Sequence, residues 1–183
     1  APTKLRQIGD SPGLINTEKD YGNNSVKLQE ILRHVREKTG KHKVIIFSQF
    51  VSMLKLITGE LDKEGMTYSY LDGSTRDRKQ AVQTFQEDNQ CRIMVISLKA
   101  GGLGLNLTEA DYIYLIDPWW NPAVEQQAID RTHRIGQDKH IFAYKMICKD
   151  TVEEKILNLQ ERKKTLAEDL ITAEQSFVKK LTE

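Results

Sequence analysis

Residues 43–48 read KVIIFS, a short and solidly apolar run. Such a run is typical of a parallel strand buried on both faces, because helices cover a sheet of this kind above and below. The segments RIMVIS (92–97) and YIYLID (112–117) have the same character. Two further strands are predicted at 68–71 and 140–148, so the chain is expected to form a mostly parallel sheet.

Apolar residues at helical spacing separate these strands. The last of three such stripes follows Ser74, which is predicted to cap its helix, with Asp77 in a capping-box-like position. The stripes are formed by Leu28, Ile31, Leu32 and Val35, then Met53, Leu54, Ile57 and Leu61, then Ala81, Val82 and Phe85. Strands that alternate with helices indicate βαβ units with right-handed crossovers. The predicted fold class is therefore α/β, over residues 25–150.

The two flanks of this domain differ from it in pattern. Residues 1–24 are rich in Gly, Pro, Asn and Asp, which favours a lead-in segment that is mostly loop. Residues 151–183 are predicted to form a long amphipathic helix, or a pair of helices, that packs across this lobe or a partner lobe. Its apolar positions include Val152, Ile156, Leu159, Leu166 and Leu170. The first residue is Ala1, which favours a piece of a longer protein.

The net charge, the cysteine count and the lengths of the apolar runs indicate which classes of protein this chain can belong to. The 183 residues carry a formal net charge of +1, so any polyanion site must be local rather than a property of the whole surface. Cys91 and Cys148 are too few for a disulfide framework, which is typical of a reduced intracellular protein. The sequence contains no apolar run of membrane-spanning length, and no membrane partner is expected.

The segment from Asn121 to Gly136 has well-marked helix ends. Asn121 suits an N-cap, Pro122 suits the first helical position, and Gly136 suits a left-handed C-cap. Gln127, Arg131 and Arg134 would then project from one face of this helix. Two forked guanidinium groups on a rigid helix can grip phosphate oxygens. The alternative is an ordinary surface helix whose arginines pair with nearby carboxylates.

Four loops follow the predicted strands, at the edge where parallel sheets bind ligands. They read SQF (48–50), DGST (72–75), SLKAGGLGLNL (97–107) and DPWWNP (117–122). The glycines of the third loop permit close approach of a ligand or form a tight turn. Lys99 is a phosphate contact or a solvated lysine. Trp119 and Trp120 pack internally or press against a sugar or base.

Motifs that would allow the chain to hydrolyse a nucleotide by itself are missing. The sequence has no GxxxxGK[ST] loop and no strand that ends in an acidic DExx box. It also lacks a Ser-His-Asp, Cys-His or paired-carboxylate pattern for another reaction. The two arginines are therefore expected to need a partner domain.

The chain resembles the second RecA-like lobe of the Swi/Snf family, DNA-dependent ATPases within helicase superfamily two. The resemblance covers roughly residues 25–165 and rests on VIIFSQF, LDGSTRDRKQAVQTF, VISLKAGGLGLNLTEAD, DPWWNPAVEQQAIDRTHRIGQ and TVEEKI, in that order. It implies a three-layer RecA-like fold with a C-terminal helical brace. In the similar segment LRQIGDSPGLI, Gly9 and Ser11 replace the family's usual Cys and His.

The resemblance also implies roles for individual residues. Arg131 and Arg134 match the arginine fingers that complete an ATP site formed mainly by the first lobe. The nucleotide-binding positions would be Gln127, Gly102, Gly104 and Asn106. The positions along the DNA backbone would be Ser48, Gln49, Gly73, Ser74, Arg76, Ser97, Lys99 and Trp120. No metal ligand is expected in this lobe.

The expected activity is ATP-dependent translocation along double-stranded DNA by the complete two-lobe enzyme, with ATP and Mg²⁺; this lobe alone would bind neither. The implied partners are duplex DNA, the first lobe and DNA-bound proteins such as nucleosomes. The implied location is the nucleus in a eukaryote, or the cytoplasm and nucleoid in a bacterium. Two alternatives remain: a lobe of a helicase that unwinds RNA or DNA duplexes, and a nucleic-acid-binding module without enzymatic activity.

Overall fold

The structure is a computed structural model, and it describes residues 2–11, 14, 25–101, 105–119, 121–130, 132 and 140–166. The strands are β1 (Lys43–Ser48), β2 (Tyr68–Leu71), β3 (Ile93–Ser97), β4 (Ala110–Leu115) and β5 (Phe142–Lys145). The helices are α1 (Pro2–Asp10), α2 (Val26–Glu37), α3 (Val51–Lys63), α4 (Arg78–Glu87), α5 (Leu98–Gly101) and α6 (Pro122–Asp130). A further helix, here called the C-terminal helix, is described over 152–166.

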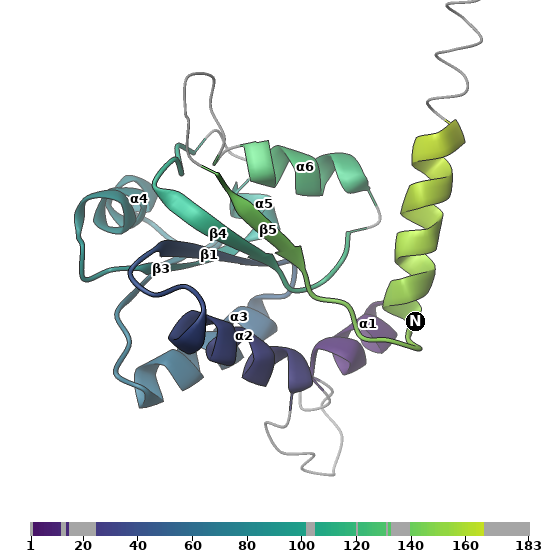
Figure 1. Ribbon diagram of the computed structural model, residues 1–183, viewed down its shortest axis with the longest axis horizontal. Helices are drawn as coiled ribbons and strands as arrows, with labels where there is room; N and C mark the ends of the chain where they lie inside the picture. The colour runs from purple at the N-terminus through teal and green to yellow at the C-terminus, as the bar shows by residue number, and fades with distance from the viewer. Residues whose placement is uncertain are drawn as a thin grey trace, which may run out of the picture.

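The five strands form one sheet in the order β2-β3-β1-β4-β5, and every pair is parallel. Helices α2 and α3 cover one face, and α4, α5 and α6 cover the other (Figure 1). This arrangement confirms the predicted α/β fold with a parallel sheet in three layers.

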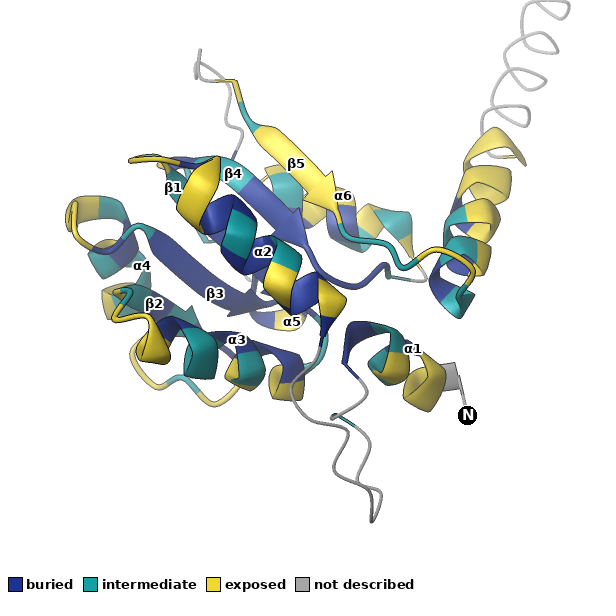
Figure 2. Cartoon of the chain, turned by 60° about the horizontal axis from the view of Figure 1, so that its bottom comes forward, coloured by how far each residue is buried: buried dark blue, intermediate teal, exposed yellow. Residues whose placement is uncertain are grey.

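The central strand β1 shows why the apolar runs have no polar alternation. Val44 and Ile46 face the core beneath α2 and α3, whereas Ile45 and Phe47 face the core beneath α4 to α6. All four side chains are fully buried. Figure 2 shows the same burial along β3 and along the second half of β4, and shows β5 as an exposed edge of the sheet. A strand covered by helices on both faces needs apolar residues at every position.

Several predicted boundaries are wrong. Helix α4 begins at Arg78 and is capped by Asp77, whose carboxylate accepts a hydrogen bond from the Gln80 backbone at 2.9 Å. Ser74 is not the cap, because its hydroxyl donates to Asp72 in the preceding turn. Strand β4 begins and ends two residues before the predicted 112–117, and β5 is shorter than the predicted 140–148. Apolar runs locate strands but do not mark their ends.

Helix α1 corrects the prediction that the lead-in segment is mostly loop. Its inward side carries Arg6 and Asp10, both buried, while Leu5 and Ile8 are partly or largely exposed. Arg6 donates a hydrogen bond to the Pro118 carbonyl, which lies 112 residues away. Hydrophobic periodicity does not detect a helix whose buried side is polar.

The C-terminal helix confirms the predicted helix at this position but not its predicted buried stripe. Leu159 and Leu166 are 45% and 63% exposed. The buried residues are Glu153, Ile156 and Gln160. The side chains that this helix buries within the described range are therefore two polar ones and one apolar one. Predicted residues beyond 166 lie outside the described part of the chain.

Close packing against the sheet explains why position 101 holds a glycine, which has no side chain. A Cβ atom at this position would lie 2.7 Å from Cε1 of the buried Phe47 ring.

We expect Gly101→Ala to lower the free energy of unfolding by about 1–3 kcal/mol, because the core must shift to accept the methyl group. Urea denaturation measures this change. The matched control is Gly59→Ala within α3, where a Cβ meets nothing within 4 Å, so a small increase in stability is expected. Equal behaviour of the two variants would contradict the packing explanation.

Candidate functional site

The loops that follow β1 to β4 meet at one edge of the sheet, as predicted. The strands end in register, with Ser48 beside Ser97, Leu71 beside Ile96 and Phe47 beside Leu115. The loop segments at 48–50, 72–75, 97–101 and 117–119 therefore start from a common line. We call this line of loops the carboxyl edge.

The loop after β2 is a compact turn organised by Asp72. This buried carboxylate accepts hydrogen bonds from the backbone and the hydroxyl of Ser74, each at 2.7 Å, and from the Tyr70 hydroxyl at 2.9 Å. The hydrogen bond from the Ser74 hydroxyl is the main reason that the pKa of Asp72 is lowered. The ionised Asp72 thus holds the turn while Gly73, Ser74 and Arg76 stay exposed.

The loop after β1 is joined to the loop after β4 through Asp117. The Gln49 backbone donates to the Asp117 carboxylate at 3.0 Å, and the Gln49 side chain donates to the Pro118 carbonyl at 3.4 Å. Burial raises the pKa of Asp117. Ser48 is fully buried, and its oxygen accepts a hydrogen bond from the Phe50 backbone. Ser48 and Gln49 therefore hold the loops of the carboxyl edge in place through internal hydrogen bonds.

The loop after β3 places Lys99 near α6. Ser97 is buried, and its hydroxyl accepts a hydrogen bond from the Ala100 backbone at 3.2 Å, which caps α5. Lys99 on α5 is exposed, and α5 packs against α6. Asn106 is exposed elsewhere, where its carbonyl accepts a hydrogen bond from Gln86 near the C-terminal end of α4. Gly102 and Gly104 lie outside the described residues.

Helix α6 starts as predicted and is described as far as Asp130, and of the remaining predicted helical residues only Thr132 lies in the described part of the chain. The Asn121 side chain accepts a hydrogen bond from the Ala123 backbone at 3.1 Å, and the exposed Gln127 lies in the last turns of the helix. Thr132 forms a turn in which its backbone donates to Ile129. The predicted site residues Arg131, Arg134 and Trp120 lie outside the part of the chain that the structure describes.

The loop between β4 and α6 is held by hydrogen bonds from distant segments. Three of its carbonyl groups accept hydrogen bonds from side chains near the two ends of the chain. Arg6 donates to the Pro118 carbonyl, Lys27 donates to the Ile116 carbonyl, and Gln160 donates to the Trp119 carbonyl. The loop that leads into α6 is therefore held by α1, α2 and the C-terminal helix together.

Lys27 is the centre of a buried charge cluster. It is 3% exposed, it contacts the Asp10 carboxyl at 2.8 Å, and it also pairs with Glu153. Burial alone lowers the pKa of Lys27, but the two acidic groups outweigh burial and raise it. The side chain is thus a buried ammonium ion that connects α1, α2 and the C-terminal helix.

The same cluster predicts a pH effect on stability. Burial, with a further contribution from Asp117, raises the pKa of Asp10 from 3.8 to about 8. The folded chain therefore binds this proton more tightly than the unfolded chain. The resulting stability is present below pH 3.8 and is lost as the pH rises through about 8.

We expect the wild-type chain to lose unfolding free energy relative to Asp10→Asn as the pH is raised from mildly acidic to mildly alkaline. The relative loss should be on the order of 1 kcal/mol or more, since each pKa unit corresponds to about 1.4 kcal/mol. Urea denaturation of both chains at a series of pH values measures it. A difference between the chains that stays constant with pH would contradict the raised pKa.

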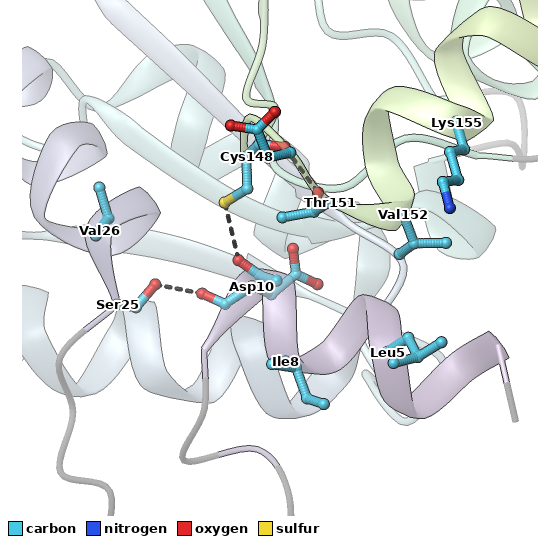
Figure 3. A pocket seen from close by; sticks show the side chains of 11 residues that line it. Leu5, Ile8, Asp10, Ser25, Val26, Cys148, Thr151, Val152 and Lys155 are labelled. Carbon is cyan, nitrogen blue, oxygen red and sulfur yellow. Dashed lines mark hydrogen bonds between the residues drawn. The ribbon is translucent and has the colours of Figure 1, made fainter.

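An open cavity of about 560 Å³ lies beside this cluster, between α1, the start of α2 and the segment that enters the C-terminal helix (Figure 3). Leu5, Ile8, Val26 and Val152 supply apolar walls. The Cys148 thiol contacts the Gly9 carbonyl at 3.1 Å on its rim. None of the predicted site residues is among the described residues that line this cavity.

Sequence reasoning missed the residues that support the edge. They are Arg6, Asp10, Lys27, Asp117, Glu125, Glu153 and Gln160. A signal did exist for some of them, because Lys27 precedes Leu28 in the buried stripe of α2 and Glu153 lies three residues before the buried Ile156. A charged residue on the inward face of a helix indicates a buried partner.

Within the described ranges, no group of three or more His, Cys, Asp or Glu side chains is arranged to hold a metal ion. No helix within these ranges is long and apolar enough to cross a membrane.

Comparison with known proteins identifies the family. The family described as "Helicase conserved C-terminal domain" matches residues 26–136. "DNA repair protein rad8" of Schizosaccharomyces pombe is 48% identical over 144 residues, which are 76% of this chain. The chain spans only 13% of the length of that relative.

Two solved structures share the fold. The C-terminal part of the Fun30 ATPase domain is 32% identical with a TM-score of 0.70, covering 86% of this chain and 53% of that one. The SWI2/SNF2 ATPase C-terminal domain of Sulfolobus solfataricus is 32% identical with a TM-score of 0.72, covering 92% of this chain and 70% of that one. The chain therefore belongs to the helicase C-terminal domain family, as a second RecA-like lobe of the Swi/Snf type.

Proposed function

We propose that this lobe is half of an ATP-driven motor on double-stranded DNA. The observation that carries the proposal is the carboxyl edge, where four loops meet beside α6 and the chain then continues into Arg131 and Arg134. A line of polar loops beside a helix that leads to two arginines suits two polyanions at once, a DNA backbone and a triphosphate.

In this proposal ATP binds between the first lobe and the face of α6 that presents the exposed Gln127. Closure of the lobes brings Arg131 and Arg134 to the triphosphate, where they stabilise the charge that develops on the transferred phosphoryl group. Among the described residues no cluster of His, Cys, Asp or Glu side chains suits a metal ion, so this proposal assigns Mg²⁺ to the first lobe. Mg²⁺ would neutralise phosphate charge in the complete site.

The DNA contacts divide into two kinds by exposure. Gly73, Arg76 and Lys99 are exposed and can approach phosphate, as can the exposed Ser74, whose hydroxyl already donates to Asp72. The other described positions, Ser48, Gln49 and Ser97, are assigned to the support of the loops, since their side chains are less exposed and their hydrogen bonds are internal. Phosphate contacts are nearly independent of base sequence, so binding should weaken steeply with salt. Alternating grips by the two lobes would move the motor along the duplex.

The likeness to a DNA repair protein favours a DNA substrate and, in a eukaryotic cell, a place in the nucleus. Proteins bound to DNA, such as nucleosomes, would be the objects that the motor displaces.

The test is ATP hydrolysis by a protein that carries this lobe together with its first lobe, measured with duplex DNA, with RNA and without nucleic acid. Stimulation by duplex DNA without strand separation supports the proposal. Stimulation by RNA alone, or strand separation, supports a duplex-unwinding helicase instead.

A further inference from the structure

Helix α6 has an acidic residue at the centre of its buried face. Glu125 is 1% exposed. One carboxylate oxygen, Oε1, accepts a hydrogen bond from the Trp119 backbone at 2.6 Å, and the other, Oε2, contacts Nζ of Lys145 at 2.5 Å. The charge of Glu125 thus joins α6 to the loop before it and to strand β5.

The C-terminal helix supplies the remaining partner of Glu125. The Gln160 side chain is buried, and its amide nitrogen donates to Oε1 of Glu125 at 3.3 Å and to the Trp119 carbonyl. An amide nitrogen carries two hydrogens, so these two bonds use its whole donor capacity. The three groups form a closed network among three segments of the chain.

Two other contacts fix the position from which Gln160 reaches this network. Ile156 is buried one turn before it, and Glu153 pairs with Lys27 two turns before it. The C-terminal helix is therefore anchored on α2 through Glu153 near its start and on α6 through Gln160 at its middle. A movement of the C-terminal helix must break this network or carry α6 with it.

We propose that Gln160 is a positioning residue for the two arginines, acting through Glu125 and the loop before α6. The inference rests on the proposed function, since it assigns to Arg131 and Arg134 a role at the triphosphate. A displacement of about 1 Å at a catalytic group can lower a rate by about 10²-fold. The C-terminal helix then sets the turnover of the motor without touching ATP or DNA.

The test uses Gln160→Met in the two-lobe protein, because methionine keeps the length of the side chain and removes both donors. We expect kcat for DNA-stimulated ATP hydrolysis to fall by about 10- to 100-fold. The KM for ATP and the affinity for duplex DNA should change little, since the arginines act mainly in the transition state. Asn158→Ala removes an exposed amide from the same helix and serves as the control, with wild-type kcat expected.

A second measurement separates positioning from a general loss of structure. If Gln160 acts through the arginines, Gln160→Met has no further effect on kcat once Arg134 is alanine. Multiplying effects of the two substitutions, or a wild-type kcat for Gln160→Met, would overturn the inference. An Arg134→Ala variant with normal turnover would instead overturn the proposed function, so the two failures are distinguishable.

Discussion

Replacement of Arg134 by alanine in the two-lobe protein is expected to lower the kcat for ATP hydrolysis by about three to five orders of magnitude. The physical reason lies in the proposed role, in which the guanidinium charge would stabilise the transition state at the triphosphate. The measurement is steady-state ATP hydrolysis at saturating duplex DNA. The affinity for DNA, measured at the same salt concentration, should stay close to wild type.

Two control variants sharpen this result. Arg33→Ala removes a guanidinium that pairs with Glu30 and Glu37 on α2, and it should leave turnover unchanged. Arg134→Lys keeps the positive charge but not the forked geometry, so it should restore only part of the lost rate. Turnover in Arg134→Ala that matched Arg33→Ala would contradict the assignment of Arg134 to the triphosphate.

The second large effect concerns stability. We expect Lys27→Met to lower the free energy of unfolding by about 3–5 kcal/mol, because the Glu153 carboxylate is left buried without its cation. The side chains of Asp10 and Glu153 are both fully buried, so water cannot replace Lys27 without opening the structure. Urea denaturation at neutral pH measures the loss.

An exposed ion pair provides the comparison for Lys27. Arg36→Met removes an exposed partner of Glu64, whose contact is 2.8 Å long. That substitution should cost no more than about 1 kcal/mol, since water screens the pair and solvates the remaining carboxylate. If Lys27→Met cost no more than Arg36→Met, the buried cluster would not be a source of stability for this lobe.

The cluster also bears on the motor. Lys27 contacts the Ile116 carbonyl at 2.6 Å, and Ile116 begins the loop that leads to α6. The same lysine connects α1 with the C-terminal helix. The segments before and after the sheet therefore meet at the loop that leads to the arginines, and in the proposed motor this would give them a route to influence hydrolysis.

The order of the five strands and of the helices α2, α3, α4 and α6, the parallel sheet and the carboxyl edge were predictable from the sequence. The apolar runs at 43–48 and 92–97 require helices on both faces, and βαβ connections place the following loops at a common edge. The cap at Asn121 was predictable as well, because its hydrogen bond is local. Such features depend on residues close together in the chain.

Only the tertiary structure decided how that edge is supported. Arg6 and Pro118, Lys27 and Glu153, and Gln160 and Trp119 meet across 112, 126 and 41 residues of sequence. No local pattern marks such pairs, because a buried charge is tolerated only when folding brings its partner to it. For the same reason α1 has no apolar stripe, and the C-terminal helix buries Glu153 and Gln160 while Leu159 faces solvent. Local chemistry determined the sheet and its loops, and long-range pairing of polar groups determined what holds the loops in place.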